Sequence, residues 1–277
     1  MKKMILMVAA LATLLTACNT DGKRAGELYQ RAQDAFAAGD YNLAKLQLDS
    51  IRTLYPKAFD MRKASIRLMQ QIDLQEQQKS LVYLDSMMQI KRASLDSILP
   101  KFVLEKDTAY QEVGNYFYPT QVVEKNVGRS FLRAQVNEQG EMSLTSIYCA
   151  LRNIHHTAVR VSVGDLSAET PASTDSYETT DLGYAIEKAD YKVGKDGGVA
   201  AFIVANQDKW ITLEFIGDRT YKTLMHPNDV KAIVELTDLA RVLSAIEEIK
   251  KEQDEANLKI RFVNRKIQEA EANKDKE

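Results

Sequence analysis

The sequence has few of the residues from which disulfide-rich and zinc-binding proteins are built. Its 277 residues include only two cysteines, Cys18 and Cys149, and three histidines. Two cysteines form at most one disulfide, which excludes the cross-linked framework of many small secreted domains. The spacings C-x-x-C and H-E-x-x-H, typical of metal sites, do not occur. The length suffices for one large or two modest domains with hydrophobic cores.

The sequence also lacks a strong charge of one sign. It has 37 basic and 39 acidic residues, and removal of a leader that contains Lys2 and Lys3 leaves 35 basic residues, a net charge of -4. Without a basic excess to neutralise phosphates, we expect no nucleic-acid partner. The composition, 45% hydrophobic and 27% charged, is typical of a folded globular protein.

The common catalytic signatures are absent as well: there is no G-x-S-x-G, S-x-x-K, Walker loop or G-x-G-x-x-G. Cys149, His155 and His156 could offer three metal ligands, but adjacent histidines on a strand point to opposite faces. We therefore expect surface or hydrogen-bonded histidines and no metal or cofactor. Cys149 lies in an apolar run, where a buried small side chain is favoured over a reactive thiol.

Several carboxylates occur close together in the sequence, and paired carboxylates could serve glycoside hydrolysis. Because sequence alone does not bring them together, solvated side chains are the favoured interpretation, and the sequence predicts a non-enzymatic protein. The residues concerned are Glu178, Asp181, Glu187 and Asp190.

A leader is the clearest positive feature. Residues 1–3 carry two lysines, and residues 4–17 form an uncharged stretch of 14 residues that ends at Cys18. This is shorter than the roughly 20 residues that a helix needs to span a bilayer, so the sequence predicts a secretory signal peptide over 1–17. The last residues, Leu15-Thr16-Ala17-Cys18, resemble the lipobox of bacterial lipoproteins. An ordinary signal peptide followed by a chance cysteine is the alternative.

The resemblance implies cleavage before Cys18 and lipid on that cysteine, as a diacylglyceryl thioether and an N-acyl chain such as palmitate. Several buried acyl chains hold a protein stably on a membrane. Asn19 stands where inner-membrane lipoproteins of enterobacteria have aspartate, and Asp21 is alone where a surface-export signal is an acidic cluster. The resemblance thus implies an outer-membrane anchor on the periplasmic face.

Residues 18–24 are polar and predict a flexible lipidated tether. Residues 25–59 show helical periodicity broken once by Gly39-Asp40-Tyr41, with small Ala32 and Ala44 on either side and Pro56 at the end. This segment resembles one tetratricopeptide repeat, which implies protein binding through a concave helical surface. A hairpin that merely packs on its neighbour is the alternative, since such arrays usually need three repeats.

Residues 60–100 and 227–277 predict two long helices, each with an apolar three-four spacing typical of a coiled coil. Asn228 or Asp229 is expected to cap the second. Pairing the two helices head to tail in one register places Gln77 against Gln253, and we expect an antiparallel stalk in this register. A second copy of the chain, giving a homodimer, is the rival partner. The apolar positions are Leu74, Leu81, Leu84, Met88, Leu95 and Ile98 in the first helix, and Leu239, Val242, Ile246, Ile249, Ala256, Ile260, Val263, Ile267 and Ala270 in the second.

Residues 101–226 read as a mostly antiparallel β-rich head inserted between these helices, which makes the fold class α+β. We expect strands at 131–136, 142–148, 159–163, 210–216 and 220–225, a short helix at 199–206 and a mobile polar loop at 167–180. Tyr116, Tyr118 and Trp210 are the candidate ligand-binding residues, with core packing as the alternative. The sequence thus predicts an envelope scaffold or adaptor for protein partners; alternatively, the head binds an envelope glycan or peptide.

Overall fold

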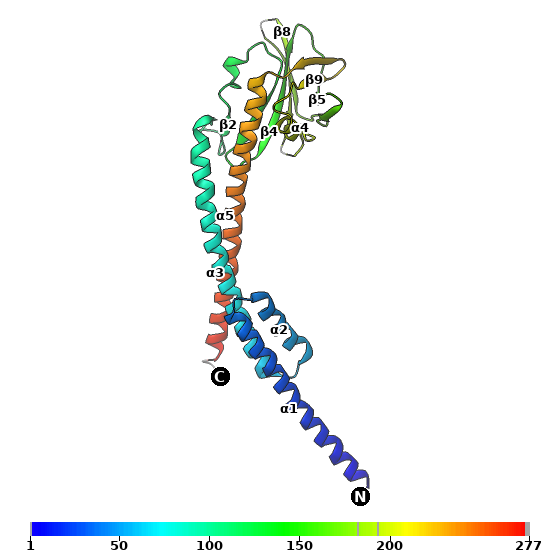
Figure 1. Ribbon diagram of the computed structural model, residues 1–277, viewed down its shortest axis with the longest axis vertical. Coiled ribbons are helices and arrows are strands. Elements are labelled where there is room, and N and C mark those ends of the chain that lie inside the picture. Colours follow the sequence, from blue (N-terminus) through cyan, green and yellow to red (C-terminus); the bar gives the residue numbers. More distant parts are fainter. Residues whose placement is uncertain (1, 182, 193, 275–277) are drawn as a thin grey trace. The chain divides into compact units, whose positions relative to one another are not determined.

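The computed structural model describes residues 2–181, 183–192 and 194–274, with side chains for 20–122, 124–181, 183–192 and 194–272. The described chain is α+β, as predicted, with five α-helices and two antiparallel sheets (Figure 1). It divides into a helical unit, Met1–Ser86 with Lys251–Glu277, and a head unit, Met87–Lys250. Each unit has its own hydrophobic core.

The helical unit contains α1 (Lys2–Ala37), α2 (Tyr41–Leu54), the first part of α3 (Phe59–Ile98) and the last part of α5 (Pro227–Lys274). Asp40 begins α2 by accepting a hydrogen bond from the Leu43 amide at 2.9 Å, which satisfies one free helix-end N–H. Small side chains in the core allow the helices to approach closely. The buried residues are Ala25, Ala32, Ala35, Ala44, Leu48, Ile51, Leu68 and Ile72.

The N-terminal part of α1 differs from the sequence prediction. Residues 20–24 belong to the helix, although their polarity predicted a flexible link. Gly22 lowers the stability of the helix by only about 1 kcal/mol, and residues 20–24 contain no proline, which would cost a helix about 3 kcal/mol. The predicted lipidation site, Cys18, lies outside the residues whose side chains are described. Within the described part of the chain, no helix combines the length and apolarity needed to cross a membrane.

The predicted contact between Gln77 and Gln253 is wrong. In the helical unit, the Gln253 side-chain amide donates to Asp85 Oδ1 at 2.6 Å. Gln77 instead lines a hollow together with Leu258 and Phe262. A shift of about one heptad keeps an apolar seam, and a carboxylate is a stronger acceptor for Gln253 than a second amide.

Among its described residues, the head unit contains ten strands in two sheets. In space the six-stranded sheet has the order β1-β2-β3-β4-β8-β7, and the four-stranded sheet has the order β10-β9-β5-β6. The unit also contains a short helix, α4 (Val199–Ala205), two 3-10 turns, η1 (Leu99–Lys101) and η2 (Val123–Lys125), the end of α3 and the start of α5. The strands are β1 Val103–Glu105, β2 Asn115–Phe117, β3 Phe131–Asn137, β4 Met142–Ala150, β5 Ala158–Val163, β6 Leu166–Glu169, β7 Ser176–Asp181, β8 Tyr184–Tyr191, β9 Thr212–Ile216 and β10 Thr220–Leu224.

The core of the head unit lies on the inner faces of both sheets. Along β3 the side chains alternate, so that Leu132, Ala134 and Val136 point into the core, as period-two hydrophobicity predicts. Phe215 of β9 contributes from the other sheet. Helices α4 and α5 add further apolar side chains: Val199, Ile203, Ile233, Leu236, Leu239 and Leu243.

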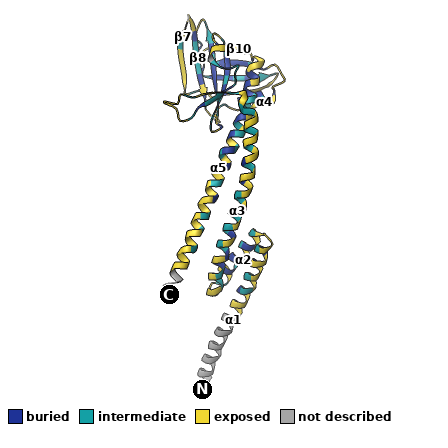
Figure 2. Cartoon of the chain, turned by 90° about the vertical axis from the view of Figure 1, so that its left-hand side faces the viewer, coloured by how far each residue is buried: buried dark blue, intermediate teal, exposed yellow. Residues whose placement is uncertain are grey.

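Two local predictions for the head unit are wrong. Residues 167–180, expected to be a mobile loop, contain most of β6 and most of β7. Both are edge strands with few buried side chains, and Figure 2 shows β7 exposed along most of its length. Strands of this kind lack hydrophobic alternation. At the start of α5, His226 Nδ1 accepts from the Asn228 amide at 3.1 Å, so His226 replaces the predicted caps.

Candidate functional site

A groove beside Trp210 is the first candidate site. Trp210 connects α4 to β9, and its side chain is 74% exposed. The groove has a volume of about 500 Å³, and apolar and charged side chains share its wall. An exposed tryptophan next to such a wall is typical of a binding surface. Its other lining residues are Gln207, Asp208, Lys209, Met225, Pro227, Val230, Lys231, Val234 and Glu235.

The turn after α4 explains why Trp210 points outward. The Lys209 amide donates to the Asn206 carbonyl at 2.9 Å, and Lys209 Nζ donates to Asn206 Oδ1 at 3.0 Å. The following residue, Ile211, is buried in the core. Because successive side chains of an extended segment alternate, burial of Ile211 directs Trp210 to solvent.

The other two predicted ligand-binding rings do not line this groove. Tyr116 and Tyr118 are partly buried and pack against the core of the head unit. Tyr118 meets Phe102 edge to face at 6.1 Å, and burial raises the pKa of Tyr116. Lys231 is the link between the two regions, because it lines the groove while its Nζ lies 5.9 Å from the centre of the Tyr118 ring.

A buried hydrogen-bond network inside the head unit was not foreseen from the sequence. Ser146 Oγ lies 2.8 Å from His156 Nε2, and His156 Nδ1 lies 2.8 Å from Glu187 Oε2. Tyr191 OH is 3.1 Å from Ser146 Oγ. The order serine, histidine, carboxylate is that of a hydrolytic triad, in which histidine takes the serine proton.

This network is closed to substrate. Ser146 is 0% exposed, and the rings of Tyr148 and Phe215 lie 6.1 and 5.3 Å from that of His156. A nucleophile must reach the atom that it attacks. The network in this state therefore cannot perform hydrolysis, and its hydrogen bonds serve to hold the core together.

Glu187 organises the loop before β5. Its Oε1 accepts from the Ile154 amide at 2.6 Å and the His155 amide at 3.0 Å, and its Oε2 accepts from the His156 amide at 2.8 Å. Burial acts to raise the pKa of Glu187, but the hydrogen bonds from His156, Ile154 and His155 outweigh it and hold this pKa below its ordinary value.

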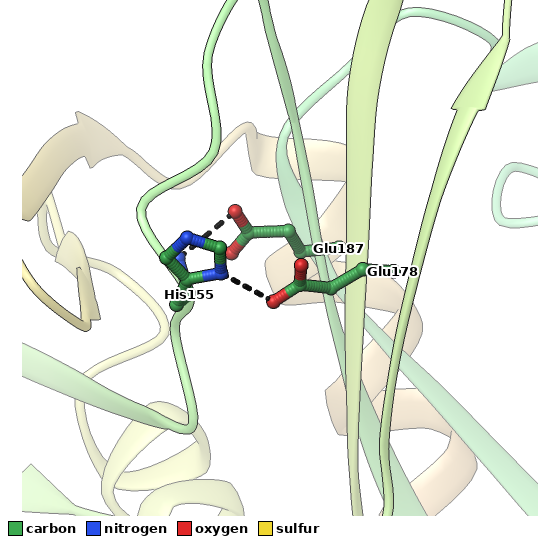
Figure 3. A group of neighbouring side chains, drawn as sticks. All are labelled: His155, Glu178 and Glu187. Carbon is green, nitrogen blue, oxygen red and sulfur yellow. Dashed lines mark hydrogen bonds and ion pairs between the residues drawn. The ribbon is translucent and has the colours of Figure 1, made fainter.

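His155, Glu178 and Glu187 form the one group of potential metal ligands found among the described residues. Their ligand atoms lie within 4.8 Å of one another. In Figure 3 the His155 ring points toward Glu178, and its Nδ1 is 2.8 Å from Glu178 Oε1. Both Glu187 oxygens already accept two hydrogen bonds each, so a metal would have to displace backbone donors. The geometry suits a surface His–Glu ion pair better than a metal site.

Cys149 does not join the histidines. It lies on the outer face of β4, three residues from Ser146, and therefore on the opposite side from His156. Both histidines are hydrogen-bonded, as expected from the sequence. Of the four clustered carboxylates, Glu178 and Glu187 are directly opposed on neighbouring strands, whereas Asp190 accepts a hydrogen bond from Thr145 on the outer face.

The helical unit carries a second groove, between α2 and α3. Its volume is about 240 Å³, and Leu48, Ile66 and Met69 provide its apolar wall. Asp49 and Arg52, which form an ion pair at 3.1 Å, lie at its polar rim. Further apolar side chains on the same two helices are exposed: Leu46, Leu54 and Phe59.

No protein-family model, curated protein or solved structure matches the chain.

Proposed function

We propose that the chain is a lipoprotein of the cell envelope, anchored to the outer membrane through Cys18, that acts as a non-enzymatic scaffold or adaptor for protein partners. The leader and its lipobox resemblance support the anchor. The closed Ser146–His156–Glu187 network supports a role other than catalysis. The groove between α2 and α3 is the observation that carries the adaptor role.

This groove has the composition of a protein interface. Ile66 is 60% exposed at its edge, although folding would ordinarily bury such a side chain. An apolar centre surrounded by a polar rim is the usual anatomy of a surface that binds another protein. Arg62 stiffens the rim, because its guanidinium donates to the Pro56 carbonyl at 2.9 Å. The resemblance of residues 25–59 to a tetratricopeptide repeat agrees with protein binding.

We further propose that α3 and α5 run antiparallel as a coiled-coil stalk. In the helical unit, Asp85 and Gln253 are hydrogen-bonded. In the head unit, Lys101 Nζ and Glu235 Oε2 are 2.8 Å apart. Both pairs support the same register. A helix of 40 residues, the length of α3, extends about 60 Å. A homodimer through the same helices is the alternative.

A photo-crosslinking amino acid at position 66, placed in intact cells, tests the adaptor role. We expect a discrete adduct with one envelope protein, and Arg67 provides the matched control because it is exposed on the same helix but does not line the groove. Ile66→Asp, with the crosslinker moved to position 69, should abolish the adduct while Arg67→Asp keeps it. Equal adducts from positions 66 and 67 would contradict a role for the groove.

The second candidate function is binding of an envelope glycan or peptide by the head unit, and the exposure of Trp210 favours it. Trp210 is the only tryptophan of the chain, so its fluorescence reports on the groove alone. Peptidoglycan fragments or envelope peptides that bind should shift or quench the emission. Emission that stays constant at saturating concentrations of both classes would remove this function.

A further inference from the structure

The outer face of the six-stranded sheet carries a further pocket in the head unit, with lining residues different from those of the Trp210 groove. The antiparallel register places Phe131, Ile147 and Lys188 in one row across β3, β4 and β8. The next row contains Cys149 and Ile186. Directly opposed residues lie on the same face of a sheet, so these side chains form a continuous floor.

A tight loop forms the wall over this floor. Residues 126–129 follow η2, and the buried Asn126 side chain donates to the carbonyls of Thr120 and Val122, both at 2.8 Å. Arg129 holds the end of the loop through an ion pair with Asp229 at 2.6 Å. The volume of the pocket is about 240 Å³. This is below the roughly 300–1,000 Å³ of pockets for drug-sized ligands, so any ligand is small.

Arg133 lies in the adjoining row of the floor, together with Thr145 and Asp190. Its guanidinium stacks 5.0 Å from the centre of the Phe117 ring, and its Nε is buried with no hydrogen-bond acceptor. Within the described residues, the Arg133 side chain forms no ion pair or hydrogen bond. Burial lowers the pKa of Arg133, and the nearby carboxylates of Glu105 and Asp190 act in the opposite sense. A buried donor without an acceptor is unfavourable, and a bound anion would satisfy it.

The charged side chains around the pocket are unevenly distributed between its two ends. Arg133 and Lys188 lie toward one end without an ion pair among the described residues, and Asp190 in the row of Arg133 accepts a hydrogen bond from the Thr145 hydroxyl. Arg129 is already paired with Asp229. Asp181 lies at the other end, beside Cys149. Burial and the nearby Asp181 raise the pKa of Cys149, so its thiol is neutral and extends the apolar floor. A ligand with one anionic end therefore has one favoured orientation.

We infer that this pocket binds a small carboxylic acid with an apolar body. The carboxylate accepts hydrogen bonds from the Arg133 guanidinium, and Lys188 adds a second positive charge at that end. The apolar body lies on Phe131, Ile147 and Ile186 and points its uncharged end toward Cys149. This role does not depend on the membrane anchor or on the adaptor groove, and it goes beyond both proposed functions.

Calorimetric titration of the full chain with 3-phenylpropionate, its amide and inorganic phosphate tests this inference. A charge-assisted hydrogen bond of about 1.5–3 kcal/mol predicts that the acid binds at least about tenfold more tightly than the amide. The acid should also bind more tightly than phosphate, which cannot use the apolar floor. Equal binding of acid and amide, equal binding of acid and phosphate, or no saturable binding of the acid would overturn the inference.

Arg133→Met keeps the apolar stem of the side chain and removes its charge. We expect this change to weaken binding of the acid about tenfold or more and to leave binding of the amide unchanged. Lys195→Met is the matched control, because Lys195 is exposed, does not line the pocket and carries the same charge. Loss of acid binding in both variants, or in neither, would contradict the assigned contact.

A second measurement keeps Arg133 in place, so its result does not depend on whether Arg133→Met folds. In a Cys18→Ser chain, Cys149 is the only thiol. Bound 3-phenylpropionate should slow alkylation of Cys149 by N-ethylmaleimide at least about tenfold, whereas the amide at the same concentration should not. Equal protection by both compounds, or protection by neither, would place the acid elsewhere and overturn the inference.

Discussion

Glu187 of β8 and His156, which precedes β5, form a fully buried pair in which His156 Nδ1 and Glu187 Oε2 are 2.8 Å apart. Since the ionised carboxylate only accepts hydrogen bonds, His156 donates from Nδ1, and its Nε2 faces the Ser146 hydroxyl. The pair joins a strand of the six-stranded sheet to the loop that leads into the four-stranded sheet. It should therefore contribute strongly to the stability of the head unit.

Glu187→Gln should lower the free energy of unfolding by about 2–4 kcal/mol. The amide would replace one acceptor by a donor that faces backbone N–H groups, and each unsatisfied buried donor costs about 1–3 kcal/mol. Urea denaturation measures the loss. Glu178→Gln, on the exposed neighbour, should cost less than about 1 kcal/mol. A loss below about 0.5 kcal/mol for Glu187→Gln would show that the pair is not a major contributor.

Stability should fall in acid because of Glu187. Its folded-state pKa is lowered from 4.5, so its contribution is complete above that value and is lost as the pH falls through the folded-state pKa. His155 acts in the opposite sense. Hydrogen bonding to Glu178 raises its pKa above 6.5, so its contribution is complete below pH 6.5 and is lost as the pH rises.

Urea midpoints across the pH range check both signs. The acid-side decline should be smaller in Glu187→Gln, and the loss above pH 6.5 should disappear in His155→Ala. A wild-type decline that is unchanged in Glu187→Gln would assign the acid sensitivity to other carboxylates.

Truncation of Trp210 and truncation of Phe215 should have very different effects on the free energy of unfolding. Trp210→Ala removes an exposed ring and should change the free energy of unfolding by no more than about 0.5 kcal/mol. Phe215→Ala leaves a cavity between the sheets and should cost about 3–5 kcal/mol. Thermal and urea unfolding of both variants provides the comparison. A large loss for Trp210→Ala would mean that the ring supports the fold and is not held for a ligand.

The register of the two long helices can be checked by disulfide crosslinking. In a chain without its native cysteines, Asp85→Cys with Gln253→Cys should crosslink within one molecule. Gln77→Cys with Gln253→Cys should not, because Gln253 contacts Asp85. Mass spectrometry separates intramolecular from intermolecular products. Crosslinks found only between chains would replace the single-chain stalk by a homodimer.

The lipid anchor depends on one atom, the sulfur of Cys18. Cells fed a labelled fatty acid should incorporate label into the wild-type protein and none into Cys18→Ala, which should remain uncleaved. Cys149→Ala is the control and should be labelled like wild type. Label in Cys18→Ala would contradict the lipobox interpretation and the location that it implies.

Local sequence patterns were sufficient to predict the α+β class and several of the helices and strands. Alternation in residues 131–136 and 142–148 predicted β3 and β4, because one face of each strand must be buried. Periodicity predicted the long helices for the same reason. The edge strand β7 was missed because both of its faces are exposed, so hydrogen bonding to β8 and not hydrophobicity forms it.

The candidate sites depended on contacts between residues far apart in the chain. Ser146, His156 and Glu187 show no recognisable spacing, because sheet pairing between β4 and β8 brings Ser146 near Glu187 and the loop before β5 adds His156. The partner of Gln253, which is Asp85 and not Gln77, also could not be predicted, since every shift of seven residues keeps the apolar positions of a heptad repeat aligned. Periodicity specifies which face of an element is buried, whereas the identity of its partner depends on side chains that meet only in the folded chain.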